Sequence, residues 1–175
     1  MISPGWSAGL ALEGAAASWR ELDRPADGSR GLVSILIARE HRYGNLAVCG
    51  YLVDVFCLGV KDTIGPRTFA PDELRVFTPG YFGAYAEPPL RVPIELARSL
   101  VLGAVEYARG LGFEPHADFA RARPLLGETA GPSPIGFGDR GRPHFISGPR
   151  DDVERIVATL RSSVGDGRFG CTILG

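Results

Sequence analysis

The chain contains 175 residues, enough for one domain with its own core, and 45% of them are apolar while 22% are charged. Its formal net charge of −1 excludes an overall positive field that would draw it to nucleic acid or to an anionic membrane. The three cysteines have no CxxC spacing, so we expect no disulfide, no metal site and no cofactor. The sequence also lacks a signal-peptide pattern and an apolar run of membrane-spanning length, which predicts a cytoplasmic protein.

Residues 1–30 are predicted to form a lead segment ahead of the main domain. Residues 8–22 are rich in alanine, which favours a short helix, and a polar loop follows at residues 23–30. We therefore expect a single α+β domain at residues 31–175.

An antiparallel hairpin is predicted near the start of that domain. Residues 32–39 and 46–57 are apolar and rich in β-branched side chains, and a short loop with Gly44 and Asn45 separates them. The second run is apolar on both faces for much of its length. We therefore expect a central strand that is covered by helices on at least one side.

The next region, residues 63–89, is dense in proline, glycine and aromatic residues. This composition predicts no long regular element, apart from a short helix at residues 72–77. Tyr81, Phe82 and Tyr85 could line a binding groove, or they could pack under their own loop as part of the core. Packing is favoured, because single aromatic residues in loops usually serve as anchors.

The clearest helix is predicted over residues 93–111, where Pro93 suits the first position and Gly112 suits the position after the end. Its apolar stripe contains small residues, so another element can approach its backbone closely. We expect the hairpin to pack on this stripe and to bury Val53, Val55, Leu100, Val101, Ala104 and Ala108. A second helix is predicted at residues 116–122.

The last third predicts a β-hairpin, a helix and a closing strand. The hairpin is expected to join residues 133–137 and 143–147 through a glycine-containing loop. A helix beginning near Asp151 and a strand at residues 168–174 complete the pattern. The architecture that fits is an α+β fold, with a mostly antiparallel sheet of about five strands and helices packed on it.

Three strings of the chain resemble a family of small bacterial hypothetical proteins of GC-rich, actinobacterial type. They are LVDVFCLGVKD at residues 52–62, GFEPHADF at residues 112–119 and FGDRGRPHFISGP at residues 137–149. The resemblance spans most of the chain and implies that these strings belong to one compact unit. No activity is established for that family, so the resemblance supplies no catalytic residue. Some relatives carry an added SEC-C-type metal-binding motif, and this chain lacks its cysteine cluster.

Lys61 is the strongest candidate for a chemical role, because it is the one lysine beside eighteen arginines. It lies close to Asp54 and Asp62, and an ammonium beside carboxylates could orient a phosphate or act as a base. The alternative is an exposed Lys61–Asp62 pair, with Asp54 satisfied by backbone amides.

His116 and Asp118 have the residue types of a metal or acid/base site. The alternative is that they simply begin a helix after Pro115, where acidic groups are favoured. Arg150 precedes two aspartates before another predicted helix, and these would compete with a bound anion.

These residues support two functional hypotheses. The first is a binding or accessory module that holds a protein, peptide or nucleic-acid partner at the Lys61 end of the sheet and the aromatic loop at residues 79–85. Its binding residues are Tyr81, Phe82, Tyr85 and Arg150. The alternative is a metal-assisted hydrolase or phosphoesterase in which Asp54, Asp62, His116 and Asp118 converge on one divalent ion and Lys61 stabilises negative charge. Convergence of these side chains would favour the enzyme.

Overall fold

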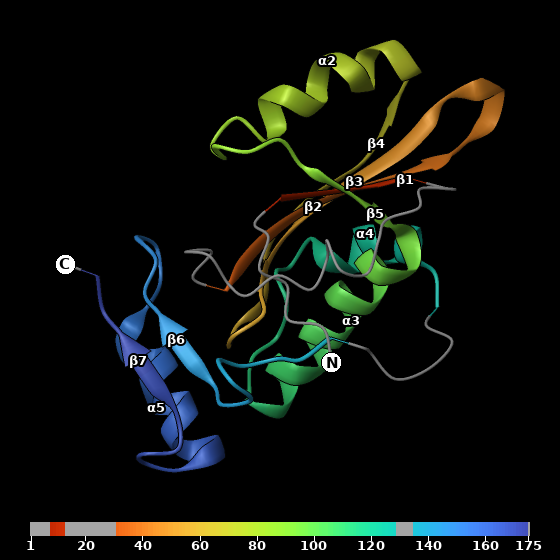
Figure 1. Cartoon of the computed structure of the whole chain (residues 1–175). Coiled ribbons are helices and arrows are strands. Elements are labelled where there is room, and N and C mark those ends of the chain that lie inside the picture. Colours follow the sequence, from red (N-terminus) through yellow and green to blue (C-terminus); the bar gives the residue numbers. More distant parts are fainter. Residues whose placement is uncertain (1–7, 13–30, 129–134, 175) are drawn as a thin grey trace.

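The computed structural model describes residues 8–12, 31–128 and 135–174, which form an α+β fold. A five-stranded sheet has the order β4-β3-β2-β1-β5, and β6 and β7 form a second, small sheet (Figure 1). The strands are β1 (Ala8–Leu12), β2 (Leu32–Glu40), β3 (Leu46–Asp54), β4 (Gly59–Phe69), β5 (Leu90–Pro93), β6 (His144–Ile146) and β7 (Gly170–Thr172). The helices are α2 (Pro71–Tyr81), α3 (Ile94–Gly110), α4 (Phe119–Leu126) and α5 (Val153–Val164), with a 3-10 turn η1 (Arg42–Gly44) between β2 and β3.

The central sheet is mixed, not mostly antiparallel. The predicted β2–β3 hairpin is present and β4 extends it antiparallel, whereas β1 pairs in parallel with both β2 and β5. β1 occupies residues 8–12, where the sequence predicts a helix; the remainder of that predicted helix lies outside the described residues. Backbone hydrogen bonds to a neighbour on each side outweigh the weak helical preference of alanine in so short a segment.

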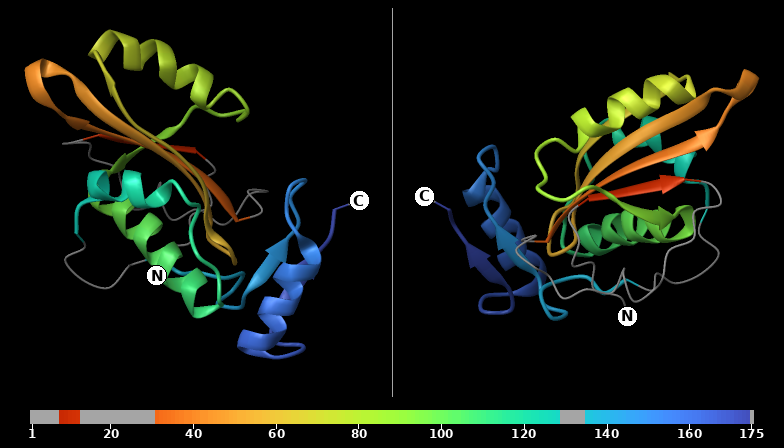
Figure 2. Two further views of the ribbon diagram at one scale, coloured as in Figure 1. Left: turned by 180° about the vertical axis from the view of Figure 1, so that it is seen from behind. Right: turned by 45° about the horizontal axis from the view of Figure 1, so that its top comes forward.

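Helices cover both faces of the central sheet (Figures 1 and 2). α2 lies on one face, called here the α2 face, while α3 and α4 lie on the opposite α3 face. The unit formed by β6, α5 and β7 sits beyond the end of the sheet at which β3 turns into β4. Within the described residues, no helix is both long enough and apolar enough to cross a membrane.

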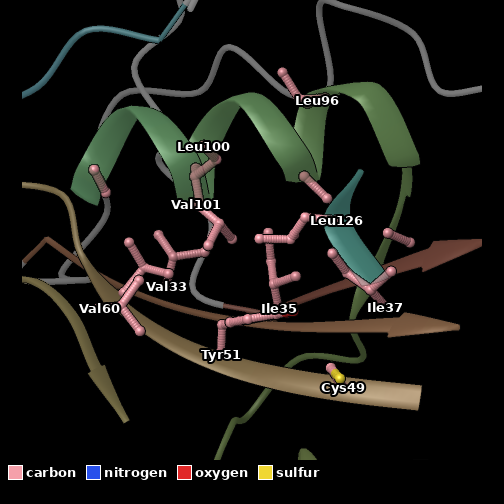
Figure 3. Close-up of a cluster of buried hydrophobic side chains, with 14 of the residues drawn as sticks. Val33, Ile35, Ile37, Cys49, Tyr51, Val60, Leu96, Leu100, Val101 and Leu126 are labelled. Carbon is pink, nitrogen blue, oxygen red and sulfur yellow. The ribbon is translucent and has the colours of Figure 1, made fainter. Parts of the chain in front are cut away.

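The main core lies between the sheet and α3, as the sequence predicts. Figure 3 shows side chains of β2 and β3 meeting those of α3 and α4. Every residue expected in this contact is buried, namely Val53, Val55, Leu100, Val101, Ala104 and Ala108. Gly59 (φ +68°) lies so close to α3 that a Cβ there would be 2.7 Å from the Ala108 Cβ and 2.9 Å from the Ala104 carbonyl oxygen. The small residues of α3 therefore do allow close approach.

The strand β4 contradicts the prediction that no long element enters the proline-rich region. It continues to Phe69 as an edge strand, although Pro66 lies within it. Its register against β3 shifts twice, between Val48 and Gly50 and between Leu52 and Val53. Edge strands tolerate proline and bulges, because their outer N–H groups need no partner within the sheet.

The helices α2 and α4 extend beyond their predicted ends, and each contains a proline, Pro79 or Pro124. Side chains from other elements stabilise the end of α4. Arg98 Nε donates to the Leu126 carbonyl oxygen at 2.6 Å, and Arg39 Nη1 donates to that of Leu125 at 3.3 Å. Cationic donors suit the carbonyl groups that a helix leaves free at its C-terminus.

Within the described residues, the C-terminal unit does not contain the predicted hairpin, whose residues 133 and 134 lie outside them. β6 pairs in parallel with β7, and α5 connects them as the crossover that parallel strands require. The glycine-containing loop ahead of β6 instead forms a tight turn, in which Arg142 N donates to the Asp139 carbonyl oxygen at 3.0 Å. The Gly138 and His144 amides bond the Val55 and Phe56 carbonyl oxygens, which fastens this unit to the end of β3.

Candidate functional site

Asp54 ends β3 and holds the turn that leads into β4. Its Oδ1 accepts hydrogen bonds from the amides of Phe56 at 2.8 Å and Cys57 at 3.0 Å, and its Oδ2 accepts from Leu58 at 3.2 Å. Burial raises the pKa of this carboxyl to about 6, although the amides and Lys61 act in the opposite direction. Asp54 is therefore committed to the backbone, as one of the two sequence alternatives anticipates.

Lys61 bonds a residue that the sequence does not single out as its partner. Its Nζ lies 2.6 Å from Asp151 Oδ2, which also accepts from the Gly148 amide at 2.8 Å. Both side chains are largely shielded, with 18% and 12% exposed. Lys61 is the extra residue in a bulge of β4, and the anticipated pair with Asp62 does not form. The lysine instead joins the sheet to the turn before α5.

Asp62 and His116 meet at the outer edge of β4. The His116 amide donates to the Val60 carbonyl oxygen at 2.9 Å, which places this segment along the strand. His116 Nε2 then lies 4.0 Å from Asp62 Oδ1, with 36% and 56% of the two side chains exposed. Asp62 Oδ1 also accepts the Thr63 amide at 2.7 Å. This pair is accessible to solvent, unlike Asp54 and Lys61.

The structure does not bring together the four proposed metal ligands. Asp54 is enclosed by its turn, and the Asp118 carboxylate lies 3.8 Å from Arg121, while its amide donates to His116 Nδ1 at 3.3 Å. Across residues 8–12, 31–128 and 135–174, no three His, Cys, Asp or Glu side chains are arranged to hold a metal ion. The residues present therefore do not fit the divalent ion on which the hydrolase hypothesis depends.

The aromatic residues near the end of α2 pack against one another. Ring centroids are 4.9 Å apart for Phe69 and Phe77, 5.9 Å for Phe77 and Tyr81, 4.7 Å for Tyr81 and Phe82, and 6.2 Å for Phe82 and Tyr85. Phe82 is buried, whereas the two tyrosines are half-buried. Phe82 therefore packs into the core, as the favoured alternative predicts. Tyr81 and Tyr85 pack only in part, and one side of each remains accessible to solvent.

The Tyr81 side chain lies directly on the sheet. Its hydroxyl accepts from Ser34 Oγ at 3.1 Å and donates to the Ile35 carbonyl oxygen at 3.3 Å. Gly50 makes this possible, since a Cβ at that position would be 2.6 Å from the hydroxyl oxygen. Burial raises the pKa of Tyr81 to about 12. The hydroxyl is therefore a fixed structural group at neutral pH.

Beyond Tyr81, part of the α2 face is left partly open. Leu52 is paired with Asp62 and with Ser34, and Gly50 is paired with Ile64, so these side chains share one face. Most are half-buried, while Asp62 is exposed. We call this surface the open corner; it consists of Leu32, Leu52, Asp62, Ile64 and Tyr81.

Arg150 is exposed and adjoins Asp151 in the turn before α5. Three further polar residues that the sequence does not single out, Asp139, His144 and Thr172, meet on the C-terminal unit. Thr172 is 28 residues from His144 along the chain, so no local spacing signal joins the three. No protein-family model, curated protein or solved structure matches this chain.

Proposed function

We propose that this protein is a binding module and that the open corner is its contact surface. The observation that carries the proposal is the strand register, which pairs exposed Asp62 with half-buried Leu52 on the face where Tyr81 lies. A carboxylate, an aliphatic side chain and an aromatic ring then adjoin one another. Such mixed surfaces are typical of protein recognition, in which an apolar centre is bordered by a charge.

A peptide segment with an arginine or lysine next to an apolar residue fits this surface best. Asp62 offers a carboxylate whose nearest basic group among the described residues is His116 Nε2, at 4.0 Å. The apolar neighbour would cover Leu52 and the Tyr81 ring. Nucleic acid is a poor match, because Asp62 repels phosphate and Lys61 is already bonded to Asp151.

The size of the surface favours a reversible complex. Covering a half-buried leucine removes only part of its surface from water, which contributes roughly 1 kcal/mol. An exposed ion pair adds about 0 to 1 kcal/mol, and ordering a flexible peptide opposes both. We therefore expect a short-lived interaction that becomes stronger when the partner presents several such segments.

The test is an array of random short peptides probed with the wild-type protein and three variants. Asp62→Asn removes the charge, and Leu52→Ser removes the apolar group. Asp118→Asn is the matched control, because this carboxylate is also exposed but adjoins Arg121 outside the open corner. We expect the wild type and the control to select peptides in which arginine or lysine adjoins an apolar residue.

The two open-corner variants should lose most of that selection while keeping the wild-type melting temperature. The proposal is overturned if Asp62→Asn and Leu52→Ser select the same peptides as the wild type. It is also overturned if the selected peptides share no basic residue.

A further inference from the structure

A carboxylate, an imidazole and a hydroxyl are aligned on the C-terminal unit. His144 Nε2 lies 2.9 Å from Thr172 Oγ1, and His144 Nδ1 lies 3.7 Å from Asp139 Oδ2. With the ring proton on Nδ1, the histidine faces the carboxylate and its Nε2 accepts the Thr172 hydroxyl proton. This is the order of groups that activates a hydroxyl as a nucleophile.

The imidazole is held in place from both sides. Gly170 pairs with His144, and a Cβ on Gly170 would be 2.6 Å from His144 Nδ1, so the ring occupies the space that glycine leaves. The Phe56 ring lies on another side, with centroids 6.5 Å apart. Gly170 thus leaves the space in which the ring lies with its two nitrogens toward Thr172 and Asp139.

The Asp139 turn carries a strained backbone. Arg140 has φ +52°, a left-handed conformation that costs energy for a residue with a side chain, and it lies between two glycines of positive φ, Gly138 and Gly141. The turn is closed by the bond from Arg142 N to the Asp139 carbonyl oxygen. Strain of this kind fits a turn whose role is to present the Asp139 side chain.

Solvent reaches this site mainly at Thr172, which is exposed, whereas 47% of the Asp139 side chain and 27% of the His144 side chain are exposed. Along β6 and β7, the side chains of Phe145 and Cys171 alternate with those of His144 and Thr172. Phe145 is fully buried in the cluster formed with α5, so His144 and Thr172 lie on the opposite face of the small sheet. A small molecule can therefore reach the Thr172 hydroxyl.

We propose that Thr172 is the nucleophile of an acyl-transfer site that accepts activated carboxylic esters. His144 is the general base, and Asp139 is a positioning residue whose carboxylate, 3.7 Å from Nδ1, stabilises the positive charge that the ring gains when it accepts the proton. Half-buried Phe56 and Ile146, beside His144 and Thr172, favour a short apolar acyl group. This site is separate from the open corner and does not depend on the binding function.

In the first step, Thr172 Oγ1 forms a bond to the ester carbonyl carbon, and its proton passes to His144 Nε2. The bond from that carbon to the leaving oxygen breaks, and the leaving group departs with the electron pair and takes up the proton. In the second step, water attacks the Thr172 ester and gives a proton to His144 Nε2. The carboxylic acid is released, and Thr172 Oγ1 recovers the proton.

The experiment measures acylation by 4-nitrophenyl butyrate. All proteins carry Cys171→Ala, because this exposed thiol adjoins Thr172 and would also react. Nitrophenolate release gives the rate, and mass spectrometry of the C-terminal peptide locates the adduct. We expect the adduct on Thr172, its complete loss in Thr172→Ala and its retention in Thr172→Ser.

His144→Gln should slow acylation by roughly 100-fold or more, the usual contribution of a general base. Its control is His41→Gln, because His41 is an exposed histidine outside this site and has no hydroxyl or carboxylate bond in the described structure. Asp139→Asn should lower kcat and leave KM and the melting temperature unchanged. An adduct on another residue, or wild-type rates in Thr172→Ala and His144→Gln, would overturn the proposal.

Discussion

Mainly aliphatic side chains close the α3 face of the central sheet, whereas aromatic rings close much of the α2 face. On the α3 face, Gly59 approaches Ala104 and Ala108 so closely that no additional atom fits between them. On the α2 face, Tyr81 covers Gly50 but leaves Leu52 half-buried at its margin.

Under the proposed function, this difference places stability on one face of the sheet and recognition on the other. Close packing of small residues leaves no surface to which a partner could bind, and it makes the α3 face sensitive to any change in volume. The aromatic cluster on the α2 face does not extend to the end of the sheet. Contacts at the margin of this cluster can therefore form or break with little change in the free energy of folding. Substitutions on the α3 face and at Asp54 should therefore change stability, whereas those at the open corner should change binding.

The largest effect is expected from Asp54→Ala. Three backbone amides that now bond the Asp54 carboxyl would be left without an acceptor at the buried end of the sheet. At about 1 kcal/mol or more for each, the loss should reach about 3 kcal/mol in the free energy of unfolding. Urea denaturation at pH 5 measures this loss. Asp62→Asn in the open corner is the control and should change stability by less than about 0.5 kcal/mol.

The same carboxyl predicts a pH dependence. Burial raises its pKa from 3.8 to about 6, so the folded state binds more protons than the unfolded state between these values. Raising the pH through this window therefore destabilises the protein, by up to about 3 kcal/mol for a shift of this size. Asp54→Asn cannot titrate at this position. The difference in the free energy of unfolding between wild type and Asp54→Asn should narrow as the pH rises from 4 to 7. A difference that stays constant over this range would contradict the raised pKa of Asp54.

Ala104→Leu should be the next most damaging change. Ala104 is fully buried in the cluster that α3 forms with the sheet, so the larger side chain must displace its neighbours there. Overpacking of this kind costs about 1 to 3 kcal/mol. Thermal unfolding of this variant is compared with Ala120→Leu, which adds the same atoms at an exposed position of α4. Equal melting temperatures would show that the α3 face is not closely packed.

The smallest effect is expected from Lys61→Arg. The guanidinium keeps a positive charge beside Asp151, so the free energy of unfolding should fall by less than about 1 kcal/mol. Peptide selection by the open corner should not change. Lys61→Met, which leaves Asp151 without its cation, should destabilise the protein more. If Lys61→Arg abolished peptide selection at an unchanged melting temperature, the lysine itself would contact the partner.

The sequence predicts those elements that carry their own signals. The β2–β3 hairpin follows from two β-branched apolar runs joined by a short loop. The helix α3 follows from helical periodicity and from Pro93 and Gly112 at its ends, and its buried residues follow from its stripe. β1 and the β6–β7 pair do not carry such signals, because their partners are distant in the chain and parallel pairing has no local turn. β4 is obscured by Pro66, which an edge position tolerates.

The contacts of the candidate site are also predictable from the sequence only where they are local. The carboxylate of Asp54 is anticipated as a ligand of backbone amides, because a short polar side chain at a strand end commonly bonds the following turn. The partner of Lys61 is not anticipated, since Asp151 is 90 residues away along the chain and meets Lys61 only in the folded protein. Relations of this kind depend on tertiary packing, which leaves no trace in local spacing.

The edges of the central sheet determine how the protein can associate with other chains. An added strand needs a row of free N–H and C=O groups, but β4 contains Pro66 and two register shifts, and His116 already bonds the Val60 carbonyl oxygen. On the other side, β5 has four residues, follows Pro89 and ends at Pro93. Both edges thus resist strand addition, which protects the protein from edge-to-edge aggregation at high concentration.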